Sequence, residues 1–504
     1  NHPVTHCQIL ETHISWVLLT GPFAYKIKKP IDLGFVDFTT LEKRQTYCLE
    51  EVRLNTRLAP ELYLGVVPIS GSAECPILHS DDQPIEYAVQ MRQFPLESTL
   101  DHVIARGELE HKHLDQLAID IARFHATIAV ADATSPFGTP QMISKNVLEV
   151  IEQFSHRRDF SLLPQKSGRE VLAWVSREHA RQTANFAVRK EHGYVRESHG
   201  DMHLANLVLL NDQVVPFDGI EFSERLRWID VMNDIAFPVM DCLARGRPDL
   251  AHRLLSAYLE QTGDYEGIRV FRYYQVYRAL VRAKVASISL NQSEHDQGRK
   301  SVFAEQLHRY WTVAHQSMQS NFSGIVLMHG VSGSGKTTIS QALLESIGAI
   351  RVRSDVERKR LFGIQPTTRR TSEEQSRLYG RQATDATYQR LLKVGEIVVD
   401  AGYPVILDAT FLQERYRRLF RTLAEERRIP FVILDIHASQ SALAERVTSR
   451  FTHGNDASDA DVQVMLKQEQ GQDPFTKSEQ PYVVRVDSEG VFNPNVIRDV
   501  LARR

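Results

Sequence analysis

Residues 199–219 read HGDMHLANLVLLNDQVVPFDG, and this stretch decides how the first part of the chain is interpreted. Asp201 stands two positions after a histidine, and Asn206 follows five positions later. A short apolar run then leads to Asp218 and a glycine. Phosphoryl transfer needs a carboxylate that accepts the proton of a hydroxyl, together with an amide oxygen and a second carboxylate that hold Mg²⁺. The spacing therefore predicts a catalytic role for Asp201 and a metal-binding role for Asn206 and Asp218.

Nucleotide-binding residues are expected upstream of this motif. Two β-type runs, "THISWVLLTG" and "FAYKIKKP", are separated by Gly-Pro and predict a hairpin. Lys26 on the second run is the candidate for binding nucleotide phosphates, and Lys28 is the alternative because strand side chains alternate. In the following helix, Glu51 is the expected partner of the lysine and Glu50 is the alternative. His125 in "ARFHA" is expected to be a packed, hydrogen-bonded residue.

The HGDxHxxN pattern with Asp-Gly resembles the aminoglycoside phosphotransferase and choline kinase superfamily, over about residues 4–320. The resemblance implies a small lobe at about 1–95, a helical lobe at about 96–320, and an adenine-reading hinge at Gln90 and Met91. The segment "RWIDVMNDIAF", which contains Asp230 and Asp234, resembles the stretch after the metal motif in small-molecule members of this group. One feature departs from the pattern, because no GxGxxG loop precedes "THISWVLL". The acceptor site is expected among the helices after Asp218, with the candidates Arg227, Asp230 and Tyr273.

A second phosphate motif lies at residues 330–337, where "GVSGSGKT" fits GxxxxGK[ST] between an expected strand and an expected helix. Its glycines allow backbone N–H groups to face phosphates at the positive end of a helix. Lys336 is expected to reach the outer phosphates as a catalytic residue, and Thr337 to hold Mg²⁺. The predicted nucleotide-binding residues are Gly330, Ser332, Gly333, Ser334, Gly335, Lys336, Thr337 and Thr338.

Other residues after the P-loop complete the second predicted site. Asp355 follows a strand, at the edge where α/β sheets bind ligands, and Asp408 ends the apolar run "PVILD" and is expected to hold Mg²⁺. Arg446 and Arg450 lie four apart before a polar loop, so they are expected to neutralise charge during transfer. From about Ile325 the chain resembles small P-loop kinases, including gluconate kinase, chloramphenicol phosphotransferase, polynucleotide kinase and zeta-toxin-like proteins. That resemblance implies that Asp355 is a catalytic base.

Composition is consistent with an ordinary globular protein of more than one domain. The chain has 504 residues, 42% of them hydrophobic and 24% charged, with a formal net charge of -3. This balance predicts no nucleic-acid partner and no membrane contact. The four cysteines show no CxxC spacing, so reduced thiols and a cytoplasmic location are expected. The N-terminal sequence lacks the pattern of a signal peptide.

The predicted fold class is a two-domain chain. An N-terminal α+β kinase-like domain of two lobes covers 1–320, and a C-terminal α/β P-loop domain with a parallel sheet covers 325–504. The predicted function is an ATP- and Mg²⁺-dependent small-molecule kinase with two sites, acting on hydroxyls of a sugar, an aminoglycoside-like compound or a nucleotide sugar. Two alternatives stay open: a P-loop kinase regulated by a nucleotide-binding pseudokinase domain, and a non-catalytic ATP-driven switch. The sequence leaves the acceptor and the oligomeric state unknown.

Overall fold

The computed structural model describes residues 7–34, 36–80, 82–155, 165–292, 296–319, 322–364, 380–453 and 462–502. The chain forms two compact units. The first unit is Asn1–Gly246 with Tyr273–His315, and the second is Arg247–Arg272 with Gln316–Arg504. The units differ from the predicted domain ranges in two respects: residues 247–272 group with the second unit, and the second unit resumes at Gln316 instead of about 325.

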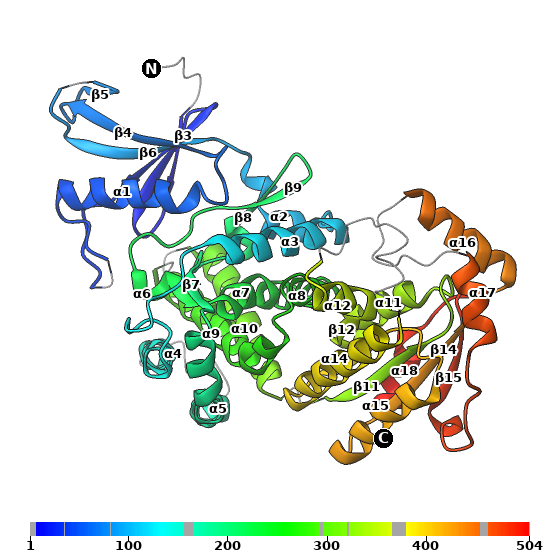
Figure 1. Cartoon of the computed structure of the whole chain (residues 1–504). Coiled ribbons are helices and arrows are strands. Elements are labelled where there is room, and N and C mark those ends of the chain that lie inside the picture. Colours follow the sequence, from blue (N-terminus) through cyan, green and yellow to red (C-terminus); the bar gives the residue numbers. More distant parts are fainter. Residues whose placement is uncertain are drawn as a thin grey trace. The chain divides into compact units, whose positions relative to one another are not determined.

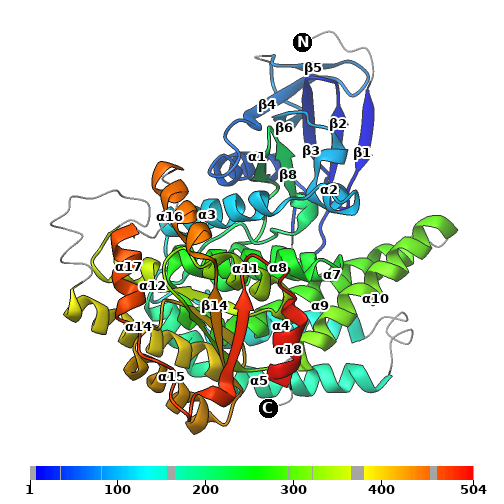
Figure 2. The ribbon, with the colours of Figure 1, turned by 90° about the vertical axis from the view of Figure 1, so that its right-hand side faces the viewer.

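The first unit begins with an antiparallel sheet. Within the described residues its strand order is β1-β2-β3-β6-β4-β5. Leu19 pairs with Ala24 across the turn at Gly21 and Pro22, so the predicted hairpin is confirmed. Figure 2 shows β1, β2 and β3 side by side. The strands are β1 (Gln8–Glu11), β2 (Ser15–Leu19), β3 (Phe23–Lys28), β4 (Tyr63–Gly71), β5 (Pro76–Leu78) and β6 (Glu86–Arg92).

Helix α1 (Leu41–Asn55) lies along this sheet (Figure 1). It begins after Thr40, whose hydroxyl accepts the Lys43 N–H at 3.3 Å and so caps the helix. Cys48, Glu51 and Leu54 are buried on one face at helical spacing. Cys48 packs in a cluster with residues of β3, β4 and β6, so this face fixes the position of Glu51 against the sheet.

A largely helical lobe completes the first unit. Its hairpin β8–β9 turns at Asn211 and Asp212, whose φ angles of 49° and 64° suit a tight hairpin turn. Leu207 pairs with Pro216, so the segments just before and just after the hairpin are held close together. Its elements are α2 (Leu100–Ala105), α3 (His111–Thr127), α4 (Pro140–Ser155), α5 (Gln165–Glu191), β7 (Val195–Glu197), β8 (Leu207–Leu210), β9 (Gln213–Pro216), α6 (Glu224–Arg227), β10 (Trp228–Asp230), α7 (Val231–Ala244), α9 (Ile268–Gln292) and α10 (Gln297–Gln319).

The second unit is built on a parallel sheet. Its described strands follow the order β12-β13-β11-β14-β15, and each neighbouring pair is parallel. The predicted parallel sheet is confirmed. The strands are β11 (Gly324–His329), β12 (Ile350–Arg353), β13 (Pro404–Asp408), β14 (Phe431–His437) and β15 (Val483–Asp487). The helices are α8 (Pro248–Thr262), α11 (Lys336–Ile347), α12 (Ser354–Leu361), α14 (Arg381–Asp400), α15 (Glu414–Arg427), α16 (Gln440–His453), α17 (Val462–Gln470) and α18 (Pro494–Ala502).

Helices cover both faces of this sheet. Ile406 belongs to a buried cluster that includes residues of α11 and α18. The next side chain, Leu407, points to the other face, where it lies near Gly395 of α14 and Phe420 of α15. The buried strands are therefore apolar on both sides, as expected for a parallel sheet.

Helix α8 packs at the edge of the sheet of the second unit. In the sequence, however, it lies between helices of the first unit. His252 donates from Nδ1 to the carbonyl of Glu345 at 2.9 Å, near the end of α11. Arg253 pairs with the Glu345 carboxylate at 2.6 Å. The Arg351 N–H donates to Ser256 at 3.2 Å, so α8 satisfies a backbone group of the edge strand β12.

No helix of the described part of the chain is long and apolar enough to cross a membrane.

Candidate active sites

Two lysines of β3 meet three carboxylates in the first unit. Lys26 lies 2.8 Å from Oε1 of Glu51 and also pairs with Asp218. Lys28 lies 2.8 Å from Oε2 of Glu51 and pairs with Glu221. Burial would lower the pKa of Lys26, but Asp218 and Glu51 raise it overall, so the ammonium stays charged. Burial would raise the pKa of Glu51, but the two lysines lower it to about 2.

Asp201 and Asn206 lie together, as their spacing predicted. The Asn206 amide donates to Oδ2 of Asp201 at 3.2 Å and to the Asp218 carbonyl at 3.5 Å. His203 lies 3.5 Å from the Asp201 carboxylate. Burial would raise the pKa of Asp201, but His203 and Arg282 lower it overall. Asp201 is therefore a carboxylate at neutral pH, which is the form that accepts a proton.

Two buried aspartates of α7 hold the segment around Asp201. Asp234 accepts the backbone N–H groups of His199 and Gly200 at 3.1 and 2.9 Å. His125 also bonds Asp234, at 3.1 Å, and is the packed residue that the sequence predicted. Seven residues along α7, Asp241 accepts the Leu204 N–H at 2.9 Å. Both ends of the loop are thus anchored to one helix.

His199 connects this loop to the segment before Asp218. Its Nδ1 accepts the Asp201 N–H at 3.2 Å, and its Nε2 donates to the Phe217 carbonyl at 2.9 Å. These two bonds fix a neutral ring with the proton on Nε2. Burial lowers the pKa of His199, in agreement with that form.

The backbone of Asp218 is held by the small lobe. Its φ angle is 60°, a left-handed value that is unusual outside glycine. Its N–H donates to the Tyr63 hydroxyl at 3.0 Å, and the N–H of Gly219 donates to Oδ1 of Asn55 at 2.7 Å. Both partners come from the lobe that carries Lys26.

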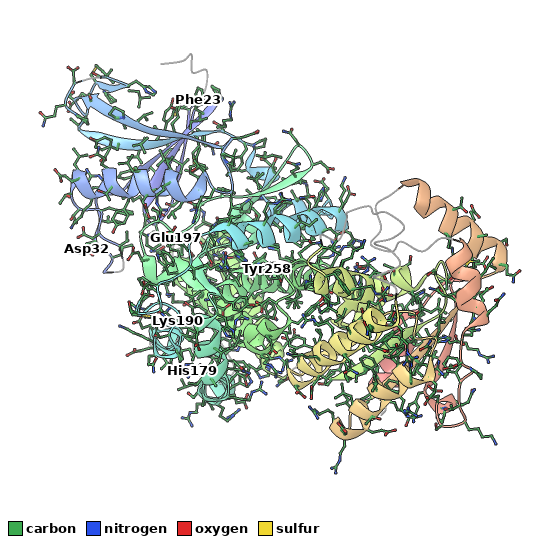
Figure 3. The ribbon with its side chains drawn as sticks, in the orientation of Figure 1. Phe23, Asp32, His179, Lys190, Glu197 and Tyr258 are labelled. Atoms are coloured by element: carbon green, nitrogen blue, oxygen red, sulfur yellow. The ribbon has the colours of Figure 1, made fainter. Side chains whose placement is uncertain are left out.

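A separate ion-pair cluster surrounds Glu197, the last residue of β7. Glu197 is labelled in Figure 3. Glu197 pairs with Arg53 at 2.7 Å, Arg57 at 3.1 Å and Arg227 at 3.2 Å. Glu50, the alternative partner of the lysine, pairs instead with Arg53 and Arg227. Glu50 and Arg227 are therefore used within this cluster, whereas Glu51 faces the lysines.

The other acceptor candidates are also engaged in the structure of the lobe. Asp230 caps α7 through the Met232 N–H at 2.9 Å and pairs with Arg189 at 2.7 Å. Tyr273 is buried beside the ring of Phe186. These contacts favour structural roles over acceptor binding.

Gln90 and Met91 lie inside the sheet, which differs from the expected hinge. Both residues belong to β6 and are paired on two sides, with β3 and with β4. Their backbone groups therefore serve the sheet. The strand ends only at Arg92, beyond the predicted position.

The P-loop of the second unit has the conformation that its glycines predicted. Gly330, Gly333 and Gly335 have φ angles of 139°, 86° and 94°. A Cβ at Gly330 would lie 2.7 Å from the Ile436 carbonyl, so the loop has no room for a side chain there. Gly335 is the last residue before α11, which begins at Lys336.

Lys336 folds back onto the loop, where its Nζ donates to the carbonyls of Gly330 and Val331 at 2.9 and 2.7 Å. The Ser334 hydroxyl is buried and has no hydrogen-bond partner among the described residues. A buried hydroxyl without a partner, next to glycines with left-handed φ angles, fits a bound phosphate. Of the remaining predicted loop residues, Thr337 is partly buried and Thr338 is exposed.

Asp408 ends β13 next to the P-loop and accepts the Ser340 hydroxyl of α11 at 3.1 Å. Asp408 pairs in register with Arg353, which is the last residue of β12. Asp355 comes two residues later and therefore lies at the same edge of the sheet. Asp355 lies 3.7 Å from Arg358 one turn later in α12. Carboxylates thus follow two adjacent strands beside the phosphate loop.

Arg446 contacts the loop from α16. Its guanidinium donates to the Ser488 hydroxyl at 2.8 Å and to the Gly333 carbonyl at 3.5 Å. Among the described residues it has no acidic partner. The Arg450 side chain lies outside the described residues. Gln468 of α17, which the sequence did not single out, accepts the Ser332 N–H at 2.8 Å.

Residues 325–475 match the family model described as an AAA domain. The match begins in β11 and includes the P-loop, so the C-terminal part of the chain is a P-loop domain, as predicted.

An uncharacterized protein of Mycobacterium tuberculosis is 29% identical over 463 residues, which is 90% of this chain and 89% of that protein. Among solved structures, a gluconokinase from Sinorhizobium meliloti is 23% identical, with a TM-score of 0.23, and covers 36% of this chain and 91% of its own. A choline/ethanolamine kinase family protein from Mesorhizobium loti is 13% identical, with a TM-score of 0.34, and covers 62% of this chain and 92% of its own.

Proposed function

We propose that this chain is an ATP- and Mg²⁺-dependent phosphotransferase with two kinase sites, one in each unit. The acceptor is a hydroxyl of a small molecule, such as a sugar, an aminoglycoside-like compound or a nucleotide sugar. The observation that carries the proposal is the position of Lys26, which bridges Glu51 and Asp218 beside the Asp201–Asn206 pair. A lysine held by a carboxylate beside the metal aspartate is the arrangement that phosphoryl transfer uses.

In the first site the residues divide into anchoring and reacting groups. Glu51 is fully buried, whereas the side chains of Asp201 and Asp218 are 33% and 41% exposed. Asp218 and Asn206 would hold Mg²⁺, which neutralises phosphate charge when bound. Asp201 would orient the acceptor hydroxyl and accept its proton.

In the second site the P-loop amides and the Ser334 hydroxyl would bind phosphates, and Lys336 would exchange its loop carbonyls for the outer phosphate. Thr337 and Asp408 would hold Mg²⁺. Asp355, which follows β12 at the sheet edge, would accept the proton of a second hydroxyl.

The test uses radiolabelled ATP with a panel of sugars, aminoglycosides and nucleotide sugars. Asp201→Ala and Lys336→Ala are compared with the unchanged chain. Two active sites predict that each variant loses transfer to its own acceptor. Full turnover in both variants would contradict the proposal.

A second candidate is a P-loop kinase regulated by a nucleotide-binding first unit. The turn between β1 and β2 favours it, because Thr12, His13 and Ile14 form that turn without a glycine. A short turn of this kind leaves no glycine-rich cover for the phosphates. In this case Lys336→Ala abolishes all transfer, while Asp201→Ala changes little. Tight nucleotide binding without transfer to any acceptor would instead favour a non-catalytic switch.

A further inference from the structure

Lys28 occupies a second ion-pair position beside Lys26. Its side chain is fully buried, as is that of Glu51, and the Glu221 side chain is only 3% exposed. The Lys28 ammonium lies 5.0 Å from the centre of the Phe38 ring, which covers it further. Lys26, by contrast, pairs with the partly exposed Asp218, so phosphate binding is assigned to Lys26 and not to the enclosed Lys28.

The two oxygens of Glu51 are divided between the two lysines. Oε1 bonds Lys26 and Oε2 bonds Lys28, each at 2.8 Å. Lys26 also pairs with Asp218, so a Mg²⁺-nucleotide competes for both members of that pair. Lys28 pairs with Glu221 instead and does not take part in this exchange.

We infer that Lys28 and Glu221 are positioning residues that hold Glu51 in place while Lys26 changes partner from Asp218 to a nucleotide phosphate. This inference rests on the proposed nucleotide site of the first unit. Glu221 lies three residues after Asp218, so Lys28 joins β3 and α1 to the segment that carries the metal aspartate. The Lys26–Glu51 pair should therefore keep the same geometry with and without a bound nucleotide.

The test measures binding of Mg²⁺ with AMP-PNP by calorimetry, in the full chain with Lys336→Ala to silence the second site. Lys28→Met alone removes the cation that pairs with two buried carboxylates, those of Glu51 and Glu221. The loss of this charge is strongly destabilising. The informative variant is Lys28→Met with Glu221→Gln, which removes one charge of each sign. We expect a folded chain and binding weaker by about tenfold, as for other residues that orient a ligand-binding group.

Lys29→Met is the matched control, because Lys29 pairs with the exposed Glu11 and lies outside the cluster. Normal binding by the folded double variant would overturn the inference. A second measurement needs no variant: hydrogen exchange of α1 in the unchanged chain should be the same with and without the nucleotide. A large change in α1 protection would also overturn it. No nucleotide uptake by the Lys336→Ala chain is a different result, since it overturns the proposed first site itself.

Discussion

The Tyr63 hydroxyl accepts the backbone N–H of Asp218 at 3.0 Å and so holds an aspartate whose φ angle is 60°. A non-glycine residue in this region costs about 1 kcal/mol or more, and it persists only where its surroundings impose it. Asn55 imposes the same conformation through Gly219 at 2.7 Å. The small lobe therefore holds the backbone from which the Asp218 carboxylate extends.

Tyr63→Phe should weaken Mg²⁺-dependent nucleotide binding at the first site. It removes the acceptor for the Asp218 N–H and keeps the ring that packs in the small-lobe core. Loss of one buried hydrogen bond of about 1–1.5 kcal/mol corresponds to about tenfold in affinity. Calorimetry in the Lys336→Ala background measures the effect. Tyr25→Phe is the matched control, because the Tyr25 hydroxyl bonds Gln90 instead. Equal binding by the two variants would argue against a role for Tyr63.

Asp234→Asn should change the acid unfolding of the first unit. Burial would raise the pKa of Asp234, but mainly its hydrogen bond with His125 lowers it from 3.8 to about 2. A lowered carboxyl pKa stabilises the fold above about pH 4, and that stability is lost as the pH falls toward 2. A difference of this size corresponds to about 2 kcal/mol. Asp234→Asn should therefore be less stable at neutral pH and show a flatter stability profile between pH 4 and pH 2, followed by circular dichroism. A parallel profile for both chains would contradict this assignment.

Local sequence was sufficient for the parts of each site that lie close together in the chain. Asp201 and Asn206 are five residues apart on one loop, and Asp218 follows one tight hairpin. The P-loop is also local, because its glycines and Lys336 form one turn before α11. Strand runs of the second unit were predictable because buried parallel strands are apolar throughout.

Contacts between distant residues were not predictable. Tyr63 and Asn55 are 155 and 164 positions from their partners, and nothing in a single sequence marks such a pairing. Lys28 and Glu221 were missed as a pair for the same reason. The hinge prediction at Gln90 differs from the structure because the strand continues to Arg92, and strand ends carry weak signals. The sequence of α8 also does not show that this helix belongs to the second unit. An amphipathic pattern predicts that one face of a helix is buried, but it does not say against which surface.

Gly330→Ala should destabilise the second unit and abolish nucleotide binding there. The added Cβ would lie 2.7 Å from the Ile436 carbonyl and 2.8 Å from the Ser334 hydroxyl, at a φ of 139° that alanine rarely adopts. The backbone carbonyl cannot move aside, so the loop must distort. Gly490→Ala is the control in the same unit, because its nearest neighbour would lie 3.6 Å away. Calorimetry with Mg²⁺-ADP, in an Asp201→Ala and Asp218→Asn background, isolates the second site. Normal uptake by Gly330→Ala would show that the loop does not bind phosphate in this conformation.

Arg253→Met should lower the stability of the second unit, although residue 253 lies within the range predicted for the first domain. Arg253 pairs with Glu345 at 2.6 Å, and both side chains are mostly buried, at 17% and 15% exposure. The helix that starts at the P-loop is held near its end by this pair and by His252. The loss of a partly buried ion pair predicts a decrease of about 1–3 kcal/mol in the free energy of unfolding, more than for an exposed pair.

Arg269→Met, which breaks a pair with the exposed Glu266, is the control and should change this free energy by less than about 1 kcal/mol. Urea unfolding with and without Mg²⁺-ADP, in an Asp201→Ala and Asp218→Asn background that silences the first site, separates the units, because the nucleotide then stabilises only the second unit. If Arg253→Met left the nucleotide-stabilised transition unchanged, α8 would not support the P-loop helix.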